Sequence, residues 1–428
     1  MDHVHNVDPR PRHHAVGLLV ALAFASLLAG CSSSSTAPPI PTTEVPLSLL
    51  NITVDADTFQ VGSTRTFVAQ AYDTLGALLG NQTIHWSTSD PGVITIGTSG
   101  VASAVGEGSA WVHAVSGGQS DSASVYVYPD TGWYVQPSAA NGANLYGVYF
   151  RPDGRSGWAV GNGGKIISTS DAGVHWAVQI SNTAFTLNGV WFTSDQDGWA
   201  CGTNGTVLST NDAGVTWTWL SNVATGAILK DIAFADANHG WACGSNGTIV
   251  STIDGGANWT VSTLSTSSTF NGISFHGISD VWAVGDGGFI AGTHDGGTSW
   301  YLLTGLTSQP LRSVWRLDDS HALAVGQQGT VLATSAGPDS VVWSLEPSVG
   351  ASNNLFGVFL VDLQLGYMVG FNAGGLVLRT DDGGVNWMPQ QARTTLQLND
   401  VYFVDRLRGW AVGNGGTVVH TATGGQRR

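Results

Sequence analysis

A repeat of about 42 residues constrains the fold of this chain more than any other feature. The motif Gly-Trp-Ala-Val-Gly, with close variants, occurs seven times at spacings of 41 to 44 residues, and its copies begin at positions 157, 198, 240, 281, 322, 366 and 409. Such a period is typical of propellers and related arrays. Each unit also contains Leu-x-(Gly/Asp/Ser)-(Val/Ile)-x-Phe, a tight Asn-Gly or Gly-Gly turn, and Asp-Gly-Gly-x-x-Trp or variants of them. Asn-Gly and Gly-Gly suit the two-residue turns that join antiparallel strands, because both central residues of such a turn need a positive φ. We therefore predict a seven-bladed β-propeller over residues 130–428.

The two ends of the repeat region complement each other. The last unit, Leu398–Thr421, supplies three strands and then stops without a Trp-containing fourth strand. The segment 132–136 (Gly-Trp-Tyr-Val-Gln), which precedes the first unit, matches the missing strand. We predict that it pairs with the C-terminal three strands, because closure removes the exposed sheet edges of an open array.

The N-terminal segment has the features of an export signal. Residues 15–29 form an apolar run that is shorter than the roughly 20 residues needed to span a bilayer, and the run ends in Leu28-Ala29-Gly30-Cys31. This arrangement resembles the bacterial lipobox, which implies that residues 1–31 are a lipoprotein signal peptide and that Cys31 is lipidated. The Ser-, Thr- and Pro-rich residues 32–45 are predicted to form a flexible linker. We expect a lipid-anchored protein of the cell envelope, in the outer membrane if the host is Gram-negative.

Residues 46–129 show the alternation of a small all-β module. Short runs with a period of two residues predict six or seven short strands, separated by Gly- and Pro-containing turns, which favours a β-sandwich. The segments 86–90 (Trp-Ser-Thr-Ser-Asp), 100–104 and 106–110 look like those of a group 2 bacterial Ig-like domain. The predicted fold class is therefore all-β, with an Ig-like β-sandwich followed by the seven-bladed β-propeller. The predicted role of the sandwich is a stalk, with adhesion as the alternative.

The segment 168–176 (Ser-Thr-Ser-Asp-Ala-Gly-Val-His-Trp) recurs four more times and closely matches the Asp-box, or bacterial neuraminidase (BNR) repeat. An Asp at such a turn is expected to accept hydrogen bonds from backbone N–H groups one or two residues on. The Trp is expected to fill the space between neighbouring blades. In the fifth unit the pattern is lost at residues 336–339, where we expect a longer and looser turn. We predict a structural rather than catalytic role for the five carboxylates, which are Asp171, Asp212, Asp254, Asp295 and Asp382.

These motifs together make residues 130–425 resemble the propeller family of the photosystem II stability and assembly factors. The resemblance implies a propeller that binds a client protein during assembly of a membrane complex. That family is associated with a basic arginine surface, whereas the arginines of this chain are scattered among more numerous acidic residues.

Asp-boxes also occur in sialidases, so an extracellular glycosidase is the alternative from the enzyme class. A sialidase needs three arginines and a Tyr nucleophile with a Glu, and Glu346 is the only glutamate of the propeller. Hydrolysis by two carboxylates stays open because Asp is plentiful. We nevertheless predict no enzymatic activity, no cofactor and no metal site, since the histidines lack metal-ligand spacing. Asp-rich loops such as 195–197 are interpreted as solvated, with weak calcium binding as the alternative. Cys201 and Cys243 replace a valine of other units and are expected to be buried and unpaired.

The charge balance limits the possible partners. A net charge of −15 disfavours nucleic acid, because phosphate binding depends on clustered Lys and Arg. Variation between the units concentrates in the polar connections between blades, where we expect a ligand to bind. We predict a monomeric, non-catalytic binding or scaffold protein for a protein or carbohydrate at the cell envelope; the alternatives are the glycosidase and an assembly factor for a membrane complex. The connections are residues 137–144, 179–186, 220–228, 261–269, 302–310, 344–354 and 388–397.

Overall fold

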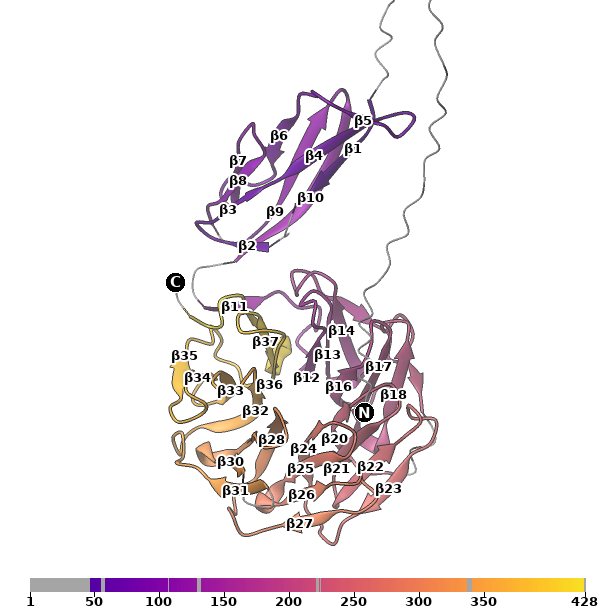
Figure 1. The fold of residues 1–428 in the computed structure, drawn as a ribbon, viewed down its shortest axis with the longest axis vertical. Coiled ribbons are helices and arrows are strands. Elements are labelled where there is room, and N and C mark those ends of the chain that lie inside the picture. Colours follow the sequence, from indigo (N-terminus) through magenta and orange to yellow (C-terminus); the bar gives the residue numbers. More distant parts are fainter. Residues whose placement is uncertain are drawn as a thin grey trace, which may run out of the picture. The chain divides into compact units, whose positions relative to one another are not determined.

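The structure is a computed structural model that describes residues 47–54, 58–106, 108–128, 132–220, 223, 225–336 and 341–426. The predicted signal peptide, Cys31 and the linker lie outside the described residues, as does the turn of the fifth unit. The described residues form strands and only five short 3₁₀ turns, so the all-β prediction is confirmed (Figure 1). None of their helical segments has the length and apolar character needed to cross a bilayer.

The first part, residues 47–128, contains short strands in three hydrogen-bonded sheets. The sheet orders are β1-β4-β5, β2-β10-β9-β6 and β3-β8-β7. A core that includes Phe67, Ile94 and Val112 lies among them, and the Phe67 ring meets Trp86 edge-on at 6.3 Å. The strands are β1 (Leu47–Thr53), β2 (Thr58–Gln60), β3 (Thr64–Thr66), β4 (Val68–Asp73), β5 (Leu78–Leu79), β6 (His85–Thr88), β7 (Ile94–Ile96), β8 (Val101–Ala104), β9 (Gly108–Ser116) and β10 (Gln119–Tyr128).

This part has more strands than the sequence predicts. Each predicted period-two run overlaps a strand, but the described residues hold ten strands where six or seven were expected. The additional strands β2, β3 and β5 have only two or three residues each. A strand of that length has too few side chains to show alternation, so pattern analysis misses it.

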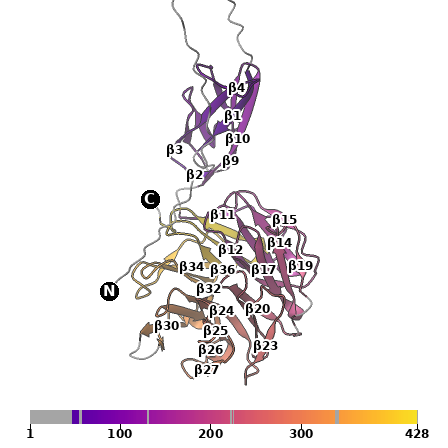
Figure 2. The same cartoon turned by 45° about the vertical axis from the view of Figure 1, so that its right-hand side comes forward.

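The second part, residues 132–426, holds seven four-stranded antiparallel sheets within its described residues. Figures 1 and 2 show these sheets, the blades, arranged around a common centre. Six blades follow the chain in order, and the seventh combines both ends of the region. Blades 1 to 6 are β12 (Leu145–Phe150), β13 (Gly157–Gly161), β14 (Lys165–Thr169), β15 (Ala177–Gln179); β16 (Leu187–Phe192), β17 (Asp197–Gly202), β18 (Val207–Asn211), β19 (Thr218–Trp219); β20 (Leu229–Phe234), β21 (Gly240–Gly244), β22 (Thr248–Thr252), β23 (Thr260–Thr263); β24 (Phe270–His276), β25 (Asp280–Gly285), β26 (Ile290–Thr293), β27 (Tyr301–Leu303); β28 (Leu311–Arg316), β29 (Ala322–Gly326), β30 (Val331–Ala336), β31 (Val341–Leu345); β32 (Asn354–Leu360), β33 (Gly366–Phe371), β34 (Gly375–Thr380) and β35 (Met388–Gln390). Blade 7 is β36 (Leu398–Phe403), β37 (Gly409–Gly413), β38 (Val418–Thr421) and β11 (Trp133–Gln136).

Blade 7 closes the ring as the sequence predicts. Strand β11 pairs antiparallel with β38, with Trp133 opposite Thr421 and Gln136 opposite Val418. The Trp133 side chain is fully buried and lies edge-on to Phe403 at 5.8 Å. The pairing of residues 132–136 with the C-terminal strands is therefore confirmed.

Aromatic rings stack between the blades in a repeated pattern. The Trp of a Gly-Trp motif lies face to face with the Phe that ends the first strand of the next blade: Trp158 with Phe192 at 3.7 Å, and Trp410 with Phe150 at 3.6 Å across the closure. A Cβ at Gly198 would lie 2.4 Å from the Phe192 ring, so this position must be glycine. The sequence assigned the space between blades to the Asp-box Trp alone, and the structure shows that the Gly-Trp motif shares it.

The turn between the second and third strands differs from the predicted two-residue turn. In five blades it is a 3₁₀ turn of three residues: η1 (Asn162–Gly164), η2 (Thr203–Gly205), η3 (Asp286–Gly288), η4 (Gln327–Gly329) and η5 (Asn414–Gly416). Two successive residues have a positive φ, as at Asn204 (60°) and Gly205 (65°). A Cβ at Gly205 would approach the Thr225 carbonyl oxygen to 1.9 Å, which explains the glycine.

Candidate functional site

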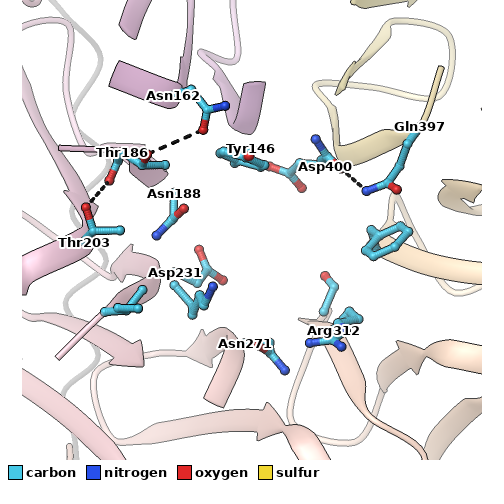
Figure 3. A pocket seen from close by; sticks show the side chains of 15 residues that line it. Tyr146, Asn162, Thr186, Asn188, Thr203, Asp231, Asn271, Arg312, Gln397 and Asp400 are labelled. Carbon is cyan, nitrogen blue, oxygen red and sulfur yellow. Dashed lines mark hydrogen bonds between the residues drawn. The ribbon is translucent and has the colours of Figure 1, made fainter. Parts of the chain in front are cut away.

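A cavity of about 440 Å³ lies at the centre of the propeller and is called the hub cavity below. Its walls come mainly from the first strands of the blades, supplemented by three connection residues and two turn residues (Figure 3). Every blade contributes the x residue of its Leu-x-(Gly/Asp/Ser) segment. The complete lining is Tyr146, Asn162, Thr186, Asn188, Thr203, Ile228, Lys230, Asp231, Asn271, Arg312, Ser313, Phe356, Gln397, Asn399 and Asp400.

A β-bulge at the start of each first strand shapes this wall. In all seven blades the strand register shifts between the Leu, which is Phe270 in blade 4, and the residue two positions later, as between Leu229 and Asp231. A regular strand sends successive side chains to opposite faces, whereas a bulge breaks the alternation. Consecutive residues such as Lys230 and Asp231 can therefore both line the cavity.

Asparagines at the x position fasten neighbouring blades together. The side-chain amide of Asn188 donates to the Leu229 carbonyl at 2.6 Å, and Asn271 and Asn399 make the same contact with the next blade. Within the described residues, the side-chain carbonyls of Asn188 and Asn271 accept no hydrogen bond. The fixed amides therefore present free acceptors beside the cavity.

Two carboxylates in the wall connect blades through backbone hydrogen bonds. Asp231 accepts from Ile232 N at 2.8 Å and from Ile273 N of the next blade at 3.0 Å. Asp400 accepts from Val401 N and, across the closure, from Val148 N. Desolvation raises the pKa of Asp231 and of Asp400 to about 7 in each case. The other blades have Gly or Ser here, so these two positions are the acidic variants of one structural position.

Lys230 and Arg312 are the cations of the cavity wall. Arg312 forms an ion pair with Asp286 at 3.0 Å, and Asn271 donates to the same carboxylate oxygen. Lys230 has no hydrogen-bond or ion-pair partner in the described part of the chain. The wall therefore combines amides and aromatic rings with two carboxyl groups and two cations.

The Asp-box carboxylates lie away from the hub cavity, and each is held by three local hydrogen bonds. Asp254 accepts from Thr252 Oγ1 at 2.9 Å, from Asn258 N at 2.7 Å and from the Asn258 side-chain amide at 2.8 Å. The prediction of bonds from residues one or two positions on was wrong, because the donor is four positions on. The nearer N–H of Gly256 donates instead to Thr252 Oγ1. The same contacts recur at Asp171, Asp212, Asp295 and Asp382.

These contacts suit an ionised acceptor. Hydrogen bonds from Ser299 and Thr293 lower the pKa of Asp295 to about 2. A carboxyl group that is ionised at neutral pH has no proton to donate as a general acid. The structural role of the five Asp-box residues nevertheless stays a prediction, which the next substitution tests.

We expect Thr252→Val to destabilise the propeller without altering its shape. The buried hydroxyl of Thr252 links Asp254 and Gly256, and Val keeps its volume while removing three hydrogen bonds. Leaving these groups unsatisfied should cost about 1–3 kcal/mol of unfolding free energy in a denaturant titration. Thr260→Val, at an exposed position of β23, is the matched control and should change little. Equal stability of the two variants would contradict the structural role.

The two cysteines of the propeller do not line the hub cavity. Cys201 and Cys243 are free thiols and fully buried, as expected. Among the described residues, no group of three or more His, Cys, Asp or Glu side chains is placed to hold a metal ion. Weak calcium binding by loops such as 195–197, the alternative given from the sequence, therefore has no support among these residues.

Three arginines outside the cavity are paired with acidic residues. Arg151 pairs with Asp195 and Arg406 with Asp362, while Arg408 lies 2.7 Å from Asp405. Each of these cations is paired with an acidic neighbour, so their charge is locally balanced.

Comparison with known proteins assigns the fold to a family. Residues 127–222 and 216–356, more than half of the chain, match the family described as photosynthesis system II assembly factor YCF48. This chain belongs to that family. Two solved structures of the family, "YCF48 bound to D1 peptide" and "YCF48 from Cyanidioschyzon merolae", are each 20% identical, with TM-scores of 0.57 and 0.56. They cover 68% of this chain and 97% and 98% of their own.

More distant propellers share only the fold. The structure of U3-55K is 9% identical with a TM-score of 0.55, and covers 68% of this chain and 98% of its own. No curated protein matches the chain. The family membership supports the propeller, while the first part of the chain lies almost wholly outside the matched residues.

The predicted ligand loops form only part of the site. Thr186, Ile228 and Gln397 come from the predicted connections, but the x residues of the first strands form most of the wall. Sequence analysis missed these positions because it read that strand as regular. The signal was present as a variable residue between two nearly constant ones.

Proposed function

We propose that this protein is a non-catalytic assembly factor of the cell envelope, whose hub cavity binds a polypeptide segment of a membrane-complex client. One observation carries the proposal. Each blade places one variable side chain in the hub cavity, while the surrounding repeat is nearly constant. Amide, hydroxyl and aromatic groups in that wall match the donors, acceptors and apolar side chains of a peptide. Family membership supports this function over a glycan-binding scaffold, since one solved structure of the family is YCF48 bound to D1 peptide.

A capture experiment tests the proposal. We expect the full chain, added to detergent-solubilised host membranes, to co-purify a client, and Tyr146→Ala with Phe356→Ala to lose it, because both rings line the hub cavity. The control combines Val215→Ala and Val385→Ala, whose side chains are 77% and 80% exposed on Asp-boxes. Client recovery that is equal for both double variants would contradict the proposal.

A glycosidase is the second candidate, and Asp231 with Asp400 is the observation that favours it. Carboxyl groups with a raised pKa in a cavity are typical of acid–base sites. Turnover of a glycan panel by the full chain, abolished in Asp231→Asn and Asp400→Asn, would replace the binding function. Against it, both carboxylates already serve as hydrogen-bond acceptors between blades.

The anchoring of the protein is also a proposal. The lipobox ending in Cys31 supports lipidation, and residues 46–129 then act as an Ig-like stalk between the anchor and the propeller. Metabolic labelling with a fatty-acid analogue, compared between the wild type and Cys31→Ser, tests this assignment.

A further inference from the structure

The cations of this acidic chain are few, and one of them, in the hub cavity, has no hydrogen-bond or ion-pair partner among the described residues. The chain has a net charge of −15 and 15 Lys and Arg residues. Lys230 lines the cavity, and no described residue forms a hydrogen bond or ion pair with it. A partly buried ammonium group loses hydration, and a nearby anion would restore favourable interactions.

The neighbouring acid does not fill this role. Both oxygens of Asp231 accept backbone N–H groups, from Ile232 and Ile273. These bonds fix the carboxylate against the wall between blades 3 and 4. Lys230 is therefore left available to a bound molecule.

Arg312 provides a second cation, two blades from Lys230 in the same wall. Asp286 holds the guanidinium through one nitrogen at 3.0 Å, while the side chain keeps 25% of its surface exposed. Its Nε is buried and has no hydrogen-bond partner among the described residues. The guanidinium is thus positioned but incompletely satisfied, as expected of a group that completes its hydrogen bonds with a ligand.

Asn271 lies at the equivalent position of the intervening blade. Its amide donates to Asp286 and to the Leu311 carbonyl, so it helps to hold the Arg312 partner. Three consecutive blades therefore place a cation, a fixed amide and a second cation in the cavity wall, from Lys230 through Asn271 to Arg312. Figure 3 shows Asn271 and Arg312 on the same side of the cavity.

We propose that Lys230 and Arg312 form a subsite for a carboxylate of the bound polypeptide, supplied by an Asp or Glu side chain or by a C-terminus. This inference rests on the proposed peptide-binding function and adds its charge specificity. Charge-assisted hydrogen bonds to carboxylates are about twice as strong as neutral ones. The polar remainder of the wall would hold the adjoining backbone.

The test uses the purified full chain and a randomised heptapeptide library in three forms. The forms have a free C-terminal carboxylate, a C-terminal amide, or a C-terminal amide with Asp and Glu omitted. Peptides retained by the chain are sequenced, and fluorescence anisotropy gives the Kd of the best binder from each form. A preference for the first form identifies a C-terminus, and enrichment of Asp or Glu in the second identifies a side chain.

Variants connect the preference to these two residues. We expect Lys230→Gln to weaken carboxylate-containing binders roughly tenfold, and Lys230→Gln with Arg312→Gln to weaken them further. Lys165→Gln, the only other lysine and not part of the cavity wall, should leave the Kd unchanged. Lys230→Gln alone removes no hydrogen bond or ion pair among the described residues, so we expect this variant to fold and to melt as the wild type does.

Two negative results are distinguishable. Acid-free peptides that bind as tightly as acidic ones, or an unchanged Kd in Lys230→Gln, would overturn the carboxylate subsite and leave peptide binding intact. If the chain retained no peptide of any form, both the subsite and the proposed peptide-binding function would be refuted.

Discussion

Replacing Trp133 with alanine should destabilise the whole propeller cooperatively. Trp133 lies in the only strand of blade 7, among its described residues, that comes from the N-terminal end of the region. Its fully buried ring contacts Phe403 and Tyr367. Loss of a buried Trp costs about 3–5 kcal/mol through lost burial and the cavity left behind. We expect the Tm in calorimetry to fall by roughly 5–10 °C.

A second substitution in the same strand separates packing from strand pairing. Val135 pairs with Val419 but is 47% exposed, so Val135→Ala should cost less than about 1 kcal/mol. If Trp133→Ala and Val135→Ala melted at the wild-type temperature, the closure would not stabilise the ring.

The stability of the propeller should depend on pH through the two wall carboxyls. Burial raises the pKa of Asp231 and Asp400 from 3.8 to about 7. The folded state therefore holds protons that the unfolded state releases, and this stabilisation is complete below pH 3.8 and lost as the pH rises to 7. The full shifts would correspond to about 9 kcal/mol for the pair. Because both side chains are only partly buried, solvent screens them, and we expect the unfolding free energy to change by on the order of 2–4 kcal/mol across that range. Denaturant titrations at several pH values measure it.

Asp231→Asn with Asp400→Asn should remove this slope, because the amides do not titrate. The slope, rather than the absolute stability, is the measured quantity, since Asn supplies one acceptor where the carboxylate supplies two. Identical slopes in the wild type and the double variant would show that the two carboxyls do not titrate between pH 4 and 7.

His420 changes the pH dependence of stability in the opposite direction. We expect its effect to become measurable in the Asp231→Asn, Asp400→Asn double variant. Desolvation lowers the pKa of His420 from 6.5 to about 3, and its Nδ1 donates to the Gly409 carbonyl at 2.9 Å. Between pH 6.5 and 3, His420 is protonated in the unfolded chain but not in the folded chain. The stabilisation that is present above pH 6.5 is therefore lost as the pH falls towards 3. The double variant should thus lose stability on acidification, and His420→Phe added to it should remove that loss.

Repetition made the blades predictable. Seven copies of one unit report the same strands independently, so the pattern of a single copy is confirmed by the others. The position of β11 followed from counting, because Trp133 supplies the strand that the last unit lacks. The fifth-unit turn and Cys31 remain predictions, since both lie outside the described residues.

The candidate site was less accessible to sequence analysis. Lys230 and Asp231 are consecutive, and strict alternation would place one of them away from the centre. The bulge that brings both to the wall is visible only in the strand register. The donor of the Asp-box bonds was likewise misplaced, because the Thr252 hydroxyl takes the nearer N–H.

The strand content, the number of blades and the pairing of the chain ends are predictable without the structure, because they depend on local periodicity and turn chemistry that every unit repeats. The tertiary structure was needed to find which variable residues share a cavity, and that Lys230 has no partner among the described residues whereas Arg151, Arg406 and Arg408 each have one. The reason is physical: a closed ring brings residues that are about 41 residues apart, or separated by 254 positions as Asn399 and Leu145 are, within hydrogen-bond distance. No local pattern encodes those distances.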